Sequence, residues 1–169
     1  MEYKKRIPQD TYVAVDVKKK KKIVSLEVTT EEVHDGMMLK KLIENAAENN
    51  DVKRVIADGA YDNKENFRYL SDNGIEAAIK VRKNSFADKL THCYPRNIVV
   101  RQQLKNFEKW KDSVSYGYRW IAETVFSSIK RTFGEYVSAR KYSNMVKEMM
   151  LKASLLYNTH LLQENSFKK

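Results

Sequence analysis

Residues 116–133 read YGYRWIAETVFSSIKRTF and place four polar side chains at a regular helical spacing. Tyr116, Arg119, Glu123 and Lys130 are separated by two, three and six residues. At 3.6 residues per turn, these positions fall within an arc of roughly 60° on one side of an α-helix. The opposite side is apolar, with Ile121, Ala122, Val125, Ile129 and Phe133. We therefore expect an amphipathic helix, buried on one face, that presents a carboxylate, two cations and a phenol on the other.

Composition predicts a folded protein with dense secondary structure. A chain of 169 residues is long enough for one domain with a proper core, which we expect to span residues 1–169. The hydrophobic content of 42% argues against disorder, and two Pro and five Gly leave little room for flexible linkers.

The formal net charge of +10 favours a polyanionic partner, most often a nucleic acid. A lysine-rich surface that aids solubility explains the same charge equally well.

Cys93 is the only cysteine, so no disulfide forms within the chain and a reducing compartment is expected. No apolar run approaches the roughly 20 residues that span a membrane, and the N-terminus lacks the apolar region of a signal peptide. We expect a cytoplasmic location.

Hydrophobic periodicity predicts an α/β chain with parallel crossovers. Strands are predicted over 11–17, 23–29, 52–57 and 75–81, and helices over 36–49, 63–73, 116–133 and 144–162. Asn63 is a candidate N-cap and Gly74 a candidate residue just beyond the helix end. Residues 18–22 are predicted as a hairpin turn and 30–33 as a weak third strand. Residues 83–111 fit neither period and predict an irregular, basic insertion.

Three acids occupy positions where chemistry is often built. Asp16 lies inside the apolar strand TYVAVDV, Asp58 directly follows the strand RVIA, and Glu123 is on the helix described above. A buried acid needs a neutralising partner, and a cluster of carboxylates suits Mg²⁺ or Mn²⁺ better than zinc. Each acid also has an ordinary structural alternative: a strand-end residue at the surface for Asp16, a turn or cap for Asp58, and an exposed pair with Arg119 for Glu123.

The spacing Tyr116-x₂-Arg119-x₃-Glu123-x₆-Lys130 resembles the Y-(2)-R-(3)-E-(6)-K signature of insertion-sequence DDE transposases. The segments IADGAYD and VAVDV resemble the other two catalytic blocks of that family. The resemblance implies an RNase H-like fold, a mixed sheet flanked by helices, with the catalytic Glu on a helix in the C-terminal half. It implies catalysis and metal binding by Asp16, Asp58 and Glu123, which would hold two Mg²⁺ ions, with Mn²⁺ as a substitute.

The same resemblance implies that the partner is double-stranded DNA, both the transposon ends and the target. Tyr116, Arg119 and Lys130 would bind DNA phosphates, and Lys83, Arg101 and Arg140 are further candidate DNA contacts. For Tyr116, a partly buried ring with a satisfied hydroxyl is an equally good alternative. We expect a prokaryotic, DNA-associated protein that forms a homodimer or pairs with an N-terminal transposase fragment.

Asp16 lies close to the start of the sequence, which leaves little room for the DNA-binding region that usually precedes this domain. A truncated or split transposase is therefore expected, and activity of this chain by itself stays open. Two alternatives remain: a catalytically silent DNA-binding or inhibitory transposase fragment, and a stand-alone RNase H-like nuclease.

Overall fold

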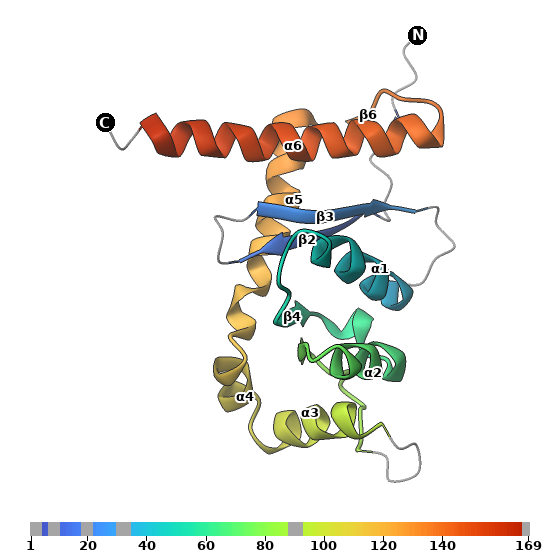
Figure 1. Cartoon of the computed structure of the whole chain (residues 1–169), viewed down its shortest axis with the longest axis vertical. Helices are drawn as coiled ribbons and strands as arrows, with labels where there is room; N and C mark the ends of the chain where they lie inside the picture. Colours follow the sequence, from blue (N-terminus) through green and yellow to red (C-terminus); the bar gives the residue numbers. More distant parts are fainter. Residues whose placement is uncertain (1–4, 7–10, 18–21, 30–34, 88–92, 167–169) are drawn as a thin grey trace. The chain divides into compact units, whose positions relative to one another are not determined.

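The computed structural model describes residues 5–6, 11–17, 22–29, 35–87 and 93–166 (Figure 1). These residues group into two compact units. One comprises the described parts of 1–32 and 121–169, and the other those of 33–120. Each unit has its own cluster of buried hydrophobic side chains. A single domain over 1–169 stays a prediction.

The first unit contains an antiparallel hairpin of β2 (Thr11–Asp16) and β3 (Lys22–Val28). Thr11 lies opposite Val28 and Asp16 opposite Lys22, with a shift of register between Ala14 and Val15. Both strands agree with the predicted ranges to within one residue. Lys22 is the part of the predicted turn at 18–22 that lies in the described residues, and the predicted strand at 30–33 lies outside them.

Two helices complete the core of this unit. The long helix α6 (Tyr142–Ser166) packs on β3, and its first residue, Tyr142, donates its hydroxyl to the carbonyl of Val28. Helix α5 (Trp120–Phe133) contributes Val125 and Ile129 to the same core. A short antiparallel pair, β1 (Lys5–Arg6) with β6 (Tyr136–Val137), was not predicted because two-residue strands have no measurable periodicity. The buried side chains are those of Leu26, Val28, Val125, Ile129, Val137, Met145, Met149, Ala153 and Leu156.

The second unit is built on a parallel strand pair with a helix between the strands. Its elements are α1 (Asp35–Ala47), β4 (Arg54–Ala57), the 3-10 helix η1 (Gly59–Tyr61), α2 (Lys64–Asp72), β5 (Glu76–Ile79), α3 (Tyr94–Lys105), α4 (Phe107–Ser113) and the 3-10 helix η2 (Tyr116–Arg119). Arg54 pairs with Glu76 and Ala57 with Ile79 in parallel register. The predicted strand–helix–strand crossover is confirmed.

The two ends of helix α2 are determined by the local sequence. The side chain of Asn63 accepts a hydrogen bond from the backbone N–H of Asn66, as an N-cap does. After the helix, Gly74 adopts φ of +67°, a left-handed conformation that glycine takes without a steric penalty. Both predicted ends of this helix are confirmed.

The prediction of an irregular insertion over 83–111 is wrong for the greater part of that range, because helices α3 and α4 occupy it. Pro95 is placed in the first turn of α3, where its missing N–H costs nothing. Asn106 caps α4 by accepting from the N–H of Lys109. Pro95 therefore lies in the first turn of a helix rather than in irregular chain.

The predicted helix over 116–133 is also corrected at its start. Residues 116–119 form the 3-10 helix η2, and the α-helix begins at Trp120. Ser115, just before, has a left-handed φ of 55°. Because a 3-10 helix has about three residues per turn, the shared arc computed for an α-helix does not extend back to Tyr116 and Arg119.

The α/β class is confirmed. The described strands form three two-stranded sheets, β1–β6, β2–β3 and β4–β5. The single mixed sheet of an RNase H-like fold stays a prediction.

Candidate active site

Asp58 lies at the carboxyl end of a parallel strand, immediately after Ala57 of β4. Its Oδ1 accepts a hydrogen bond of 3.0 Å from the N–H of Ala60 and thereby caps η1. The carboxyl ends of parallel strands are where sites of α/β proteins are usually found. The position predicted for Asp58 is confirmed, and the capping role named as its ordinary alternative is present as well.

Arg119 reaches Asp58 from 61 residues further along the chain. Its Nη2 lies 3.1 Å from Asp58 Oδ2, and the two side chains are 37% and 40% exposed. The approach is possible because η2, which ends at Arg119, packs against β4. The structure thus joins one predicted catalytic acid to one predicted phosphate-binding cation as an ion pair.

Hydrogen bonds from two side chains, Arg82 and Asn66, hold the loop after β4. Arg82 Nε donates to the carbonyl of Gly59 at 3.2 Å. The side-chain amide of Asn66 donates to the carbonyls of Tyr61 and Gly36, at 3.0 and 2.9 Å. A Cβ on Gly59 would lie 3.4 Å from the carbonyl oxygen of Lys80, so the loop passes close to the end of β5.

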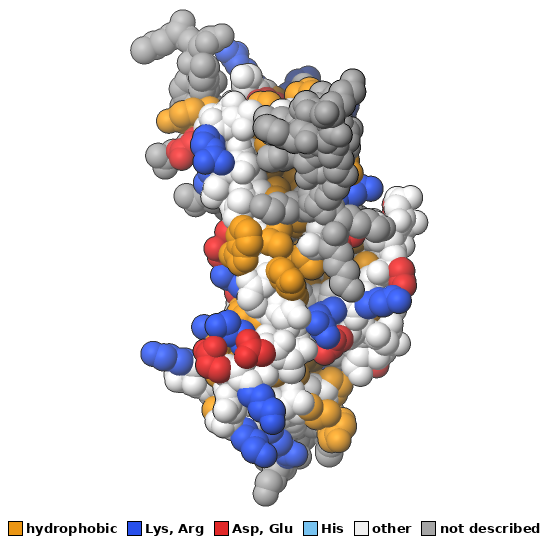
Figure 2. All heavy atoms as spheres, turned by 90° about the vertical axis from the view of Figure 1, so that its left-hand side faces the viewer, with side chains coloured by type: hydrophobic (Ala, Val, Ile, Leu, Met, Phe, Trp, Pro, Cys, Tyr) orange, Lys and Arg blue, Asp and Glu red, His pale blue; other side chains and the backbone are white. Residues whose placement is uncertain are grey.

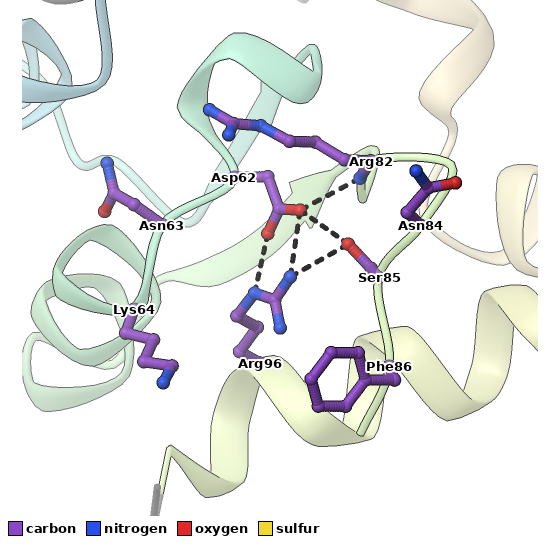
Figure 3. A pocket seen from close by; sticks show the side chains of 8 residues that line it. All are labelled: Asp62, Asn63, Lys64, Arg82, Asn84, Ser85, Phe86 and Arg96. Carbon is purple, nitrogen blue, oxygen red and sulfur yellow. Dashed lines mark hydrogen bonds and ion pairs between the residues drawn. The ribbon is translucent and has the colours of Figure 1, made fainter. Parts of the chain in front are cut away.

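Asp62 is the centre of a buried network that the sequence did not reveal (Figure 3). Its carboxylate accepts from Arg96 Nε at 2.7 Å, Arg96 Nη2 at 3.0 Å, Ser85 Oγ at 2.9 Å and the backbone N–H of Arg82 at 2.9 Å. Burial alone raises the pKa of Asp62, but the hydrogen bonds from Arg96, Arg82 and Ser85 outweigh it and hold that pKa below its usual value. The hydrogen bond that Arg96 donates to Asp62 raises the pKa of Arg96 above its usual value.

A pocket of about 450 Å³ opens beside this network. Figure 3 shows Lys64 and Phe86 on either side of Arg96, and Arg82 on the far side of Asp62. The wall of the pocket combines cationic side chains, side-chain amides and one aromatic ring, and the carboxylate of Asp62 neutralises the charge of Arg96. The lining residues are Asp62, Asn63, Lys64, Arg82, Asn84, Ser85, Phe86 and Arg96.

The other two predicted acids belong to the first unit. Asp16 is the last residue of β2, and Glu123 is exposed in the first turn of α5, where a negative charge interacts favourably with the helix dipole. Lys130, in the last turn of α5, holds its ammonium group 4.9 Å from the centre of the Phe126 ring. Asp58 belongs to the second unit, so the three acids come from both.

Neither unit, over the residues that the structure describes, gathers three or more Asp, Glu, His or Cys side chains in a metal-binding arrangement. The chemistry of the predicted ligand set still suits a hard cation, because all three donors are carboxylates. Asp58 and Glu123 are both open to solvent in part, so a hydrated cation can reach them. Sharing of one metal site by Asp16, Asp58 and Glu123 remains a proposal.

The prediction that Tyr116 shares a polar face with Arg119 and Glu123 is wrong. Tyr116 is only 8% exposed, and its ring packs on Trp110 and Phe107 with centroid distances of 5.2 and 6.4 Å. These three rings belong to the core of the second unit. The first residue of the four-residue pattern is thus part of the hydrophobic core.

The remaining candidate DNA contacts, Lys83, Arg101 and Arg140, are all exposed. On the face shown in Figure 2, Lys and Arg side chains alternate with Asp and Glu and with hydrophobic side chains. DNA contact by these three residues stays a prediction.

The family model described as the transposase DDE domain matches residues 12–159. The chain belongs to this family, and the match spans Asp16, Asp58 and Glu123. The resemblance identified from the sequence is confirmed at the level of the family, which carries a transposase-type function. No significant match among solved structures was found. No helix in the described part of the chain is long and apolar enough to cross a membrane.

Proposed function

We propose that this chain is the catalytic part of an insertion-sequence transposase, with an RNase H-like arrangement, that cleaves and joins DNA strands. Asp16, Asp58 and Glu123 are its catalytic acids. The observation that carries the proposal is the pairing of Asp58 with Arg119 within a chain whose family is defined by its DDE domain. Asp58, selected because it follows a strand, and Arg119, selected from the helical spacing, thus form an ion pair in the fold.

The three carboxylates would hold two divalent cations, Mg²⁺ or Mn²⁺. Such cations help to activate the attacking oxygen and to stabilise the leaving oxygen in phosphodiester cleavage. The carboxylates supply oxygen donors and the negative charge that binds the cations. The bond from Ala60 to Asp58 fixes the direction of that carboxylate before any ligand arrives.

Arg119 and Lys130 would hold the DNA backbone. A guanidinium group forms two parallel hydrogen bonds with a phosphate, and an ammonium group acts as a point charge. Glu123 and Lys130 lie on the same helix, in the first and last turns of α5, whereas Arg119 precedes that helix. The net charge of +10 supports binding of DNA as the partner.

The proposal is tested by strand nicking of a duplex taken from the DNA that flanks the gene. The full chain is incubated with the duplex and Mg²⁺, and EDTA defines the background. We expect Asp16→Asn, Asp58→Asn and Glu123→Gln each to reduce nicking to that background. Asp72→Asn is the matched control, because Asp72 is an exposed acid at the end of α2 and its variant should nick like the wild type.

The outcome also separates the alternatives. Nicking that survives all three substitutions would overturn the catalytic assignment. DNA binding without any nicking by the wild type would favour a silent or inhibitory transposase fragment. Nicking without strand joining would favour a nuclease.

A further inference from the structure

Arg119 already neutralises the acid that the proposed function assigns to a metal ion. Asp58 uses Oδ1 inside its own loop, where it accepts from Ala60, and Oδ2 to bind the guanidinium of Arg119. The second unit therefore supplies an internal counter-ion to this carboxylate from its own chain.

We propose that Arg119 is an exchangeable counter-ion of Asp58, which it leaves when a divalent cation binds and only then donates to a DNA phosphate. This inference rests on the proposed function and deepens it, since it sets the order in which the site is filled. Arg119 is here a positioning residue for Asp58 in the absence of metal.

The charges favour the exchange. Asp58 would hold a divalent cation through the carboxylate that pairs with Arg119, and two positive groups at one carboxylate would repel each other in a partly desolvated site. The exposure of the pair makes the exchange feasible. Ion pairs that are partly open to solvent contribute little stability, so opening the Asp58–Arg119 pair itself costs little.

The displaced guanidinium has a ready partner. Arg binds phosphate in a two-pronged geometry, and a DNA phosphate bound beside the metal would supply the negative charge that Arg119 gave up. Metal binding and DNA binding would then strengthen each other, because coupling between two sites is reciprocal.

The first test is titration calorimetry of the full chain with Mn²⁺ alone, without DNA. Arg119→Gln removes the competing cation and is expected to bind Mn²⁺ about threefold to tenfold more tightly than the wild type. Arg119→Lys keeps the charge and is expected to remain close to the wild type. Lys53→Gln removes an exposed positive charge beyond the other end of β4 and should leave Mn²⁺ affinity unchanged.

A double substitution shows whether the gain acts through Asp58. Adding Asp58→Asn to Arg119→Gln should abolish the gain in Mn²⁺ affinity, because the carboxylate that both cations compete for is then absent. If the gain persists in the double variant, Arg119 acts elsewhere and the inference is overturned.

A second readout follows DNA affinity by fluorescence anisotropy of a labelled duplex, with Mn²⁺ and with EDTA at equal ionic strength. Arg119→Gln should weaken DNA binding more with Mn²⁺ than with EDTA. An equal loss under both conditions would contradict exchange.

The two proposals fail in different ways. Wild-type Mn²⁺ binding that Arg119→Gln leaves unchanged or weakens would overturn the exchange and leave the metal site intact. Absence of Mn²⁺ binding in both proteins would overturn the metal site and the exchange together.

Discussion

Asp62 and Arg96 form a buried, two-pronged ion pair that ties the loop after β4 to helix α3. The side chain of Asp62 is fully buried and that of Arg96 is 13% exposed. Ser85 also accepts from Arg96 Nη2, at 2.9 Å, which closes a three-residue ring of hydrogen bonds. Since Asp58 and Asp62 lie at the two ends of η1, this pair holds the segment that carries the candidate catalytic acid.

Removal of Arg96 is predicted to be strongly destabilising. Arg96→Ala leaves the carboxylate of Asp62 buried without its main partner, which costs roughly 3 kcal/mol of unfolding free energy. Urea denaturation of the full chain measures the loss. Arg101→Ala, an exposed arginine on the same helix, is the control and should change stability by no more than about 0.5 kcal/mol. Equal stability of the two variants would show that the ion pair contributes little.

The same pair predicts a dependence of stability on pH. Because the pKa of Asp62 is lower in the folded protein than in the unfolded chain, its contribution is complete above the ordinary carboxyl pKa of about 3.9. It is lost as the pH falls from there through the lowered pKa. In Arg96→Ala, burial without the pair should raise the pKa of Asp62, so the difference from wild type should shrink on acidification. A difference that stays constant from pH 7 to pH 3 would contradict this.

Asn63 is predicted to act through two separate contacts. Its Oδ1 caps α2, and its Nδ2 donates to the carbonyl of Gly36 at 3.3 Å. Asn63→Ala removes both and should cost about 1 kcal/mol or slightly more. Asn63→Asp keeps the cap and loses the donor, so its stability should fall between the other two. Thermal unfolding of the three proteins checks the order, and an aspartate variant as unstable as the alanine variant would assign the effect to the Gly36 contact.

Tyr116 is predicted to matter for packing rather than for DNA. Tyr116→Ala empties part of the cluster with Trp110 and Phe107 and should cost roughly 3 kcal/mol. Tyr116→Phe keeps the ring and should bind a DNA duplex like the wild type in anisotropy measurements. Weaker DNA binding by a stable Tyr116→Phe protein would contradict this prediction and indicate that the Tyr116 hydroxyl binds a phosphate.

Structural features that depend on residues close together in the sequence were predictable. The ends of α2 followed from Asn63 and Gly74, and the position of Asp58 followed from the apolar strand before it. Both depend on contacts within a few residues, which is the range over which capping and periodicity act.

Features that depend on distant partners were not predictable. The role of Asp62 could not be predicted, because its partner, Arg96, is 34 residues away and no local pattern joins them. Tyr116 read as part of a polar face because the spacing was projected on an α-helix, whereas the chain there is a 3-10 turn. A spacing thus located the right segment and assigned one of its side chains to the wrong environment.

The central claim is that Asp16, Asp58 and Glu123 hold catalytic divalent cations. The most direct measurement is anomalous scattering from crystals of the full chain grown with Mn²⁺ and a duplex carrying the flanking DNA. The account predicts manganese peaks at coordination distance from carboxylate oxygens of these three residues, with Arg119 moved from Asp58 to a phosphate. Manganese bound only at other acids, or an Asp58–Arg119 pair still closed beside bound DNA and Mn²⁺, would contradict it.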